Sequence, residues 1–459
     1  MNSLNDAFKK DREIVDVLLE CAEFEECLML ATPTDKSVLP AINSKVVRLE
    51  YEERGHGTFV ARHESGWAGF RDFLPSSMFT DLYGYEENSQ EFKEIRSAFR
   101  DLLAFEAFSR WHKNESIFVT HDQNLLKKSI WIQRRFDVKI LSILQALEYL
   151  DIYLKKQELY YANPHLRRVD GKAFHFWFLL KTFVPEFDKA WSITVFGEKI
   201  IQNAKKIEDV LMGLAGKFEN ALRSSDRIAM EYTKRPVNST EWEMLYNFNY
   251  FCLLVTGIFD LLAWLTVHRY SLQIPTKPDR PHEVSIQITK PKSFGAKFVK
   301  TISKDNPLLA SFIVDSQDFI RLFYPMRHAV QHREPARGEQ FVDQSEGWTV
   351  SLAHIKKDAL AAIQKIDQSG YPFTRWGLLN LSGLEYLLEP HRFTRKALRE
   401  LMAFANTYIE FLNFPSLIAS HQDLIDKIAE ARPKEPEPPF LAKTYWKRES
   451  YLPVLFRDR

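Results

Sequence analysis

The sequence predicts an α+β protein: a small α/β domain over residues 1–160, then a large, mainly helical domain over 170–432 with a short β insertion. Two observations carry this prediction. Short apolar runs alternate with an amphipathic helical pattern in the first domain, whereas long segments with apolar residues at helical spacing fill most of the second. A chain of 459 residues also exceeds one ordinary hydrophobic core. Four prolines among charges open a third part, 433–459, expected to be a linker with an aromatic and basic tail.

Composition narrows the classes of function. The formal net charge is +1, so no global field attracts a polyanion, and any nucleic-acid site must be a local basic patch. The cysteines, Cys21, Cys27 and Cys252, form neither a disulfide framework nor a CxxC motif. The N-terminal residues lack the apolar core of a signal peptide. We therefore expect a cytoplasmic protein in a reducing compartment.

The most apolar segment, 250–267, raises the question of a membrane span. It carries a single charge, Asp260, and lies at the short limit of the ~20 residues that cross a bilayer. An ionisable group at the centre of such a segment is costly in lipid. We expect a buried core helix and no membrane.

The elements of the first domain follow from apolar period and turn-formers. In order, the sequence predicts strands at 27–31 and 44–50, a glycine-rich loop over 54–75, a helix over 91–112, a strand at 116–120, and a helix over 138–157. The predicted strand at 116–120 leads to His121 and Asp122, so a carboxylate stands at its carboxyl end, where α/β sheets gather ligands.

A linker is expected over 163–172, and helices dominate after it. Their expected ranges are 173–185, 189–232, 241–270, 306–334, 353–367 and 391–413. Two alternating runs, 284–288 and 348–352, are typical of strands, and we expect them to pair as a ribbon.

The most informative motif is the run from Arg327 to His332, at the end of an apolar helical segment. Histidine moves protons near neutral pH, and arginine binds phosphate oxygens with parallel hydrogen bonds. An offset of five residues puts the two side chains about 140° apart on a helix, so they must line a cleft rather than share a face. Two alternatives stay open. Both residues can simply stabilise a helix end, or His328 and His332 can hold a metal, which needs at least one more ligand.

The run Arg327-His328-Ala329-Val330-Gln331-His332 resembles the R-x4-6-H motif of the HEPN superfamily. The resemblance implies a helical bundle that dimerises and a metal-independent endoribonuclease that needs no cofactor. Arg327, His332 and His328 would be its catalytic residues. Such domains recur in toxin–antitoxin, antiphage and stress systems, so RNA and an antitoxin or defence-system partner are implied. The alternative function is a non-catalytic module that binds RNA or protein.

The first domain resembles a PIN-like nuclease in two segments: 101–107, a helix that begins with Asp101, and 117–122, a strand that ends at Asp122. The resemblance implies a carboxylate site for Mg²⁺ or Mn²⁺. The chain departs from the family pattern because its first strand leads to Thr32 rather than to an aspartate. The alternatives are a solvated helix residue for Asp101 and a helix N-cap for Asp122.

Two further features complete the candidate site. Asp260 lies in the most apolar helix and needs a partner there. It would either orient Arg327 or His332, or bond another polar group of the core. Four lysines interleaved with Phe294 and Phe298 suit single-stranded RNA, although a solvated loop explains them equally well. They are Lys290, Lys292, Lys297 and Lys300.

Overall fold

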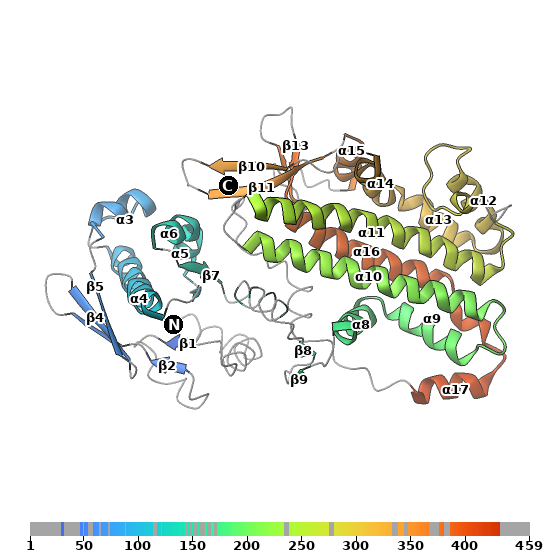
Figure 1. The fold of residues 1–459 in the computed structure, drawn as a ribbon, viewed down its shortest axis with the longest axis horizontal. Helices are drawn as coiled ribbons and strands as arrows, with labels where there is room; N and C mark the ends of the chain where they lie inside the picture. Colours follow the sequence, from blue (N-terminus) through green and yellow to red (C-terminus); the bar gives the residue numbers. More distant parts are fainter. Residues whose placement is uncertain are drawn as a thin grey trace.

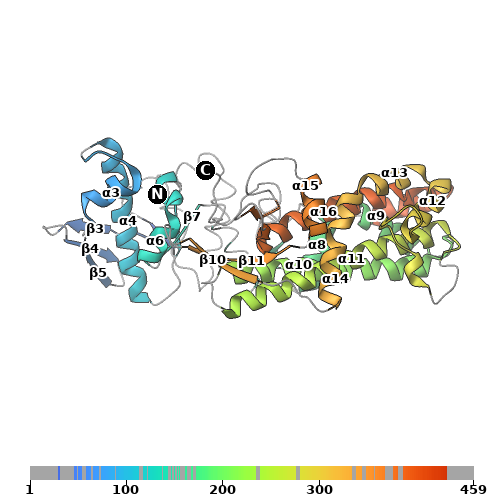
Figure 2. The same cartoon turned by 90° about the horizontal axis from the view of Figure 1, so that it is seen from above.

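The computed structural model describes residues 29–31, 46–48, 50–53, 58–63, 66–71, 74–87, 89–112, 117–120, 122–136, 138–142, 146, 149, 152, 155, 161–162, 167–168, 172–233, 238–274, 280–332, 338–343, 348–355, 357–366, 376–380 and 386–431. Over these residues the chain is mostly helical with short strands, which confirms the α+β class. Two hydrophobic cores stand apart in the sequence, one within 74–140 and one within 176–428. Figures 1 and 2 show them as an α/β region and a helical bundle. The tail 433–459 lies outside the described residues.

The first strands form two small sheets. β1 (Met29–Ala31) pairs in parallel with β2 (Val46–Arg48), which confirms strands in the two expected places. β3 (Glu50–Glu53), β4 (Thr58–His63) and β5 (Gly66–Arg71) form an antiparallel sheet. The loop predicted over 54–75 is therefore wrong. Gly66 and Gly69 lie within β5, and the β-branched and aromatic residues around them favour extended chain.

The first core forms around the long helix α4 (Gln90–His112). Its buried face carries Phe92, Ile95, Phe99 and Leu102, as the helical spacing predicted. The remaining elements are α3 (Ser76–Tyr83), β6 (Ile117–Val119), α5 (Gln123–Lys127), α6 (Ser129–Phe136) and β7 (Lys139–Leu141). β6 and β7 pair in parallel. The helix predicted from residue 138 is thus wrong at its start, because Val138, Ile140 and Leu141 are buried in a strand-like segment beside β6.

The expected linker at 163–172 is described only in part. It contains β9 (Arg167–Arg168), which pairs with β8 (Tyr161–Ala162), and its last residue begins α8. The helices that follow are α8 (Lys172–Phe183), α9 (Pro185–Phe196), α10 (Ala204–Thr233), α11 (Asn238–Tyr270), α12 (Phe294–Asp305), α13 (Pro307–Asp315), α14 (Gln317–His332), α15 (Lys357–Ile366), α16 (Pro390–Phe411) and α17 (Gln422–Ala431).

The bundle is organised around α10 and α11, which lie side by side in both views with α16 against them (Figures 1 and 2). Gly213 lies at Leu261, and Gly257 lies at Lys217, so the two helices are antiparallel in a fixed register. A Cβ at Gly257 would come within 3.2 Å of the Lys217 side chain, so the missing side chain makes room for this lysine.

Two predicted helices are each divided in the structure. The range 189–232 splits between α9 and α10, where Asn203 adopts a left-handed φ of 61° and bonds Ser271 at the end of α11. The range 306–334 splits at Ser316, between α13 and α14. Helical period alone did not reveal these breaks, because the apolar pattern continues across both turns.

Residues 284–288 form no strand, and they pair with no strand among the described residues. Side chains of α14 satisfy their backbone instead. Gln317 accepts from Ile288 N at 2.7 Å and donates to Ile286 O at 2.9 Å, and Arg321 also donates to Ile288 O. Gly295 lies directly on this segment, since a Cβ there would sit 2.0 Å from the Gln287 carbonyl oxygen.

The predicted ribbon between 284–288 and 348–352 is therefore wrong. β11 (Trp348–His354) pairs with β10 (Gly338–Asp343) on one side and β13 (Tyr386–Leu388) on the other, with β12 (Leu378–Asn380) beyond. β10 and β11 are consecutive strands after α14, and consecutive strands pair more often than segments far apart in the chain.

The apolar helix α11 meets the length and composition of a membrane span over Thr240–Tyr270. However, 67% of its most apolar window is buried against the protein itself. Phe251, Val255, Phe259 and Leu262 are fully covered. The prediction of a buried core helix agrees with this packing.

Candidate functional site

α14 carries the motif and lies along α11 through an aromatic contact. The ring of Phe259 meets Phe319 edge-on at 5.9 Å, Phe323 at 6.1 Å and Tyr324 in a stacked arrangement at 6.5 Å. Each such pair contributes about 0.5–1.5 kcal/mol beyond its burial. The buried face of α14 therefore fixes which residues emerge at its edge, and Arg327 is one of them.

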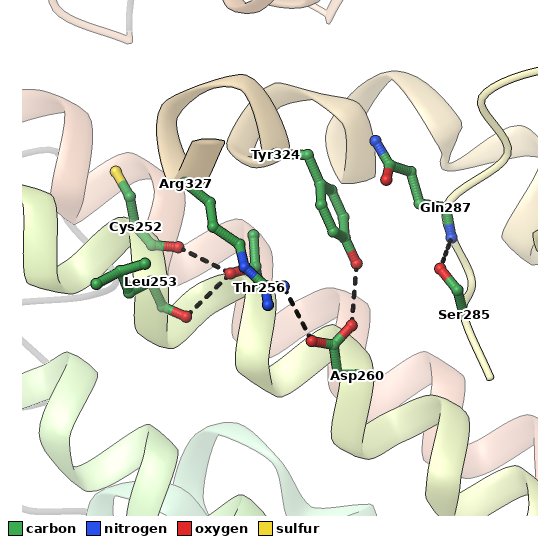
Figure 3. Close-up of polar contacts among 8 residues, drawn as sticks. All are labelled: Cys252, Leu253, Thr256, Asp260, Ser285, Gln287, Tyr324 and Arg327. Carbon is green, nitrogen blue, oxygen red and sulfur yellow. Dashed lines mark hydrogen bonds and ion pairs between the residues drawn. The ribbon is translucent and has the colours of Figure 1, made fainter. Parts of the chain in front are cut away.

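Arg327 reaches Asp260 on α11, as Figure 3 shows. Its Nη1 lies 3.0 Å from Asp260 Oδ2, and the Tyr324 hydroxyl donates to Asp260 Oδ1 at 3.2 Å. The side chains of Arg327 and Asp260 are 29% and 37% exposed, so the pair lies at the surface end of a buried network. Of the two alternatives for Asp260, the structure contains the contact with Arg327.

Burial and the neighbouring charges shift the pKa of Asp260 in opposite directions. Burial raises the pKa of Asp260, whereas Arg327, the Tyr324 hydroxyl and the charge of Lys217 oppose that rise. Burial and the neighbouring carboxylate also raise the pKa of Tyr324, so its hydroxyl stays a donor at neutral pH. The result is a guanidinium held by one carboxylate that is itself held by a tyrosine.

Beneath the pair lies an inert sulfur contact. The Cys252 thiol approaches the Met326 sulfur at 3.8 Å, and burial strongly raises the pKa of that thiol. A buried, protonated thiol is neither a nucleophile nor a metal ligand. Cys252 therefore belongs to the packing between α11 and α14.

The structure describes the side chain of only one of the two motif histidines. His328 is exposed on α14. His332 is the last residue of α14, but its side chain lies outside the described residues. Within the described part of the chain, no three His, Cys, Asp or Glu side chains gather as a metal site.

The acidic residues of the first domain give no support to a PIN-like site. Asp122 caps α5, because its Oδ1 accepts from Asn124 N at 2.7 Å and Leu125 N at 3.3 Å. This is the N-cap alternative that the sequence offered. Asp101 lies half-buried in α4. Thr32 and the residues just after it lie outside the described part.

The four lysines of the basic run are all exposed, around the first turns of α12. Their two aromatic neighbours differ. Phe298 is fully buried and unable to stack on a base, which corrects the expectation for it. Phe294 is 41% exposed, touches the His282 ring at 4.9 Å and lies 5.7 Å from the Lys297 ammonium.

Two members of the site were missed from the sequence. Tyr324 stands three residues before Arg327, the spacing that places two side chains on one helix face, and this signal could have found it. Lys217 lies on α10, far away in the sequence, and only the register of α10 with α11 brings it to Gly257.

Comparison of the chain with models of known protein families, with curated proteins and with solved structures gives no match. The HEPN-like and PIN-like interpretations therefore rest on this chain's own residues.

Proposed function

We propose that the protein is a metal-independent endoribonuclease of HEPN type, acting in a toxin-like, antiphage or stress response in the cytoplasm. The observation that carries the proposal is the Arg327–Asp260 pair. It holds a guanidinium at the partly exposed edge of the motif helix, next to the helix end that carries His332.

In the proposed reaction, the 2′-oxygen of the RNA attacks the adjacent phosphorus while the bond to the 5′-oxygen breaks. One imidazole accepts the 2′-OH proton, and an acid returns a proton to the leaving 5′-oxygen. His332 is the first candidate for these transfers, with His328 as the second proton carrier. The products are a cyclic phosphate and a 5′-hydroxyl, and no metal or cofactor takes part.

Arg327 would neutralise the charge that develops on the phosphate oxygens. Arg327 donates to Asp260 through Nη1 only, and Arg327 makes no other hydrogen bond with the described residues. A guanidinium has five N–H donors, so donors remain for a phosphate. Asp260 thus acts as a positioning residue. The exposed lysines at 290, 292, 297 and 300 would attract the backbone of the RNA.

One experiment tests the proposal. Purified protein is incubated with single-stranded RNA, with and without EDTA. Cleavage that persists in EDTA supports the HEPN-type mechanism. EDTA-sensitive cleavage that is rescued by Mg²⁺ or Mn²⁺ would instead show a metal-dependent activity, as a PIN-like nuclease would have.

The second candidate is a non-catalytic module that binds RNA or a protein partner, such as an antitoxin or defence-system component. In such a module the Arg327–Asp260 pair would have only a structural role. Binding of RNA without cleavage under every metal condition would select this alternative.

A further inference from the structure

α11 exposes three aromatic residues in a row, and we call Trp242, Tyr246 and Tyr250 the aromatic stripe. Their exposed fractions are 74%, 66% and 39%. They recur every four residues, so they share one face of the helix and stand about 6 Å apart along its axis. Exposed rings that cluster on one face often mark a binding surface, whereas scattered ones need no such explanation.

The Arg327–Asp260 pair lies farther along α11, beyond Leu254 and Ile258, which follow the aromatic stripe at the same spacing but are buried. Asp260 lies on the same face of α11, about 27 Å along the axis from Trp242 and about 15 Å from Tyr250. α14 runs back along this helix: Tyr324 bonds Asp260, and Met326 contacts Cys252. β10, the next element after α14, begins at Gly338 against Glu241 and Leu245. The end of the motif helix is therefore directed along α11 toward the aromatic stripe.

Cations accompany this face. Lys217 lies at Gly257, between the aromatic stripe and Asp260. Arg227 is exposed on α10, at the level that the helix register places opposite Tyr246 and its neighbours. Arg327 stands at the far end. Two acids flank Trp242: Glu243 is exposed and Glu241 is half-buried. Rings in a row beside a line of cations fit a strand that carries both bases and phosphates.

We infer that the aromatic stripe binds unpaired bases of the RNA, several nucleotides away from the phosphate that reaches Arg327. This inference rests on the proposed function and names its substrate as single-stranded RNA. A duplex hides the faces of its bases, whereas a single strand offers each base to a ring. At the 3.4 Å rise of a stacked strand, the span from Asp260 to the rings corresponds to about four to eight nucleotides.

The test measures binding of a labelled 12-nucleotide single-stranded RNA by fluorescence anisotropy, in the full-length His332→Ala background. Trp242→Ala and Tyr246→Ala should each weaken binding about tenfold, while Trp242→Phe, which keeps a ring, should retain most of the affinity. Phe196→Ala removes an aromatic ring that is 48% exposed at the end of α9. It should change nothing.

Unchanged affinity in Trp242→Ala and Tyr246→Ala overturns the inference, as does equal ring dependence with a matched duplex. A loss of oligomer mass in Trp242→Ala with full RNA affinity also overturns it, because the occupant is then a second copy of the chain. The proposed function is tested separately, by RNA cleavage with the unmodified protein. Ring-dependent binding without any cleavage by the unmodified protein leaves the inference standing, and cleavage with ring-independent binding removes only the inference.

Discussion

At the scale of single residues, the position of one carboxylate determines what Arg327 can do. Asp260 is buried enough for its pKa to rise, yet it stays close enough to the surface for its guanidinium partner to face solvent. A flexible, unpaired arginine would have to be ordered at every binding event, at a cost in side-chain entropy. The tyrosine hydroxyl and the carboxylate remove part of that cost in advance.

The first prediction concerns the motif itself. His332→Ala should lower the rate of RNA cleavage by about 10²–10⁴, the usual effect of removing a general acid or base. Arg327→Lys should also fail, because an ammonium makes no bidentate contact with phosphate. His421→Ala, which removes another exposed histidine just before α17, is the matched control. Full cleavage by purified His332→Ala, folded by circular dichroism, would rule out the HEPN assignment.

A second prediction follows from the raised pKa of Asp260. The folded protein holds this proton more tightly than the unfolded chain, so the free energy of unfolding falls as pH rises from the ordinary value of 3.8 through the raised pKa. Asp260→Asn cannot ionise and escapes that loss. Its stability relative to the unmodified protein should therefore increase with pH across this window, by no more than about 1 kcal/mol, since the pair is partly exposed.

Urea unfolding of both proteins from pH 3 to pH 7 measures this difference. The opposite slope, with Asp260→Asn losing ground as pH rises, would show that the attraction of Arg327 outweighs burial. Gln364→Ala, an exposed change on α15, should show no pH-dependent difference and serves as the control.

At the scale of elements, the sequence predicted the ranges of the helices better than it predicted which elements pack against each other. The ranges of α4, α11 and α16 follow from apolar spacing, since a face of Phe, Leu and Ile must be buried somewhere. The strand-like run at 284–288 was also visible, but its partner was a pair of side chains on α14. Alternation reports extended chain and says nothing of what satisfies its backbone.

The same reasoning explains what could be predicted of the site. Arg327 and His332 stand out because their chemistry and spacing are local. The contact between Arg327 and Asp260 spans 67 positions, and it was visible only as the need of a buried carboxylate for some partner. Lys217 gave no signal, because its place depends on the register between two helices.

A third prediction belongs to the segment that α14 holds. Gln317 bonds both Ile288 N and Ile286 O, and it is 7% exposed. Gln317→Leu leaves these two backbone groups without their partner and should lower the free energy of unfolding by about 1–3 kcal/mol. Hydrogen exchange at Ile288 should accelerate more than exchange in α10. Gln422→Leu, at an exposed position of α17, is the control. Unchanged exchange at Ile288 would show that the segment is held by its apolar contacts alone.

At the scale of the whole molecule, the fourth prediction is a two-fold homodimer that brings two copies of Arg327-to-His332 together. Arg327 and His332 stand about 140° apart on one helix, and the pair around Arg327 is partly exposed, where water weakens electrostatic stabilisation. A second copy would cover the site and complete it. Light scattering at micromolar concentration should give twice the 53.8 kDa of one chain. His328→Glu places like charges where the copies meet and should give a single chain, whereas His421→Glu should not. A mass of one chain at every concentration, with or without RNA, contradicts the dimer and shifts the balance toward the binding module.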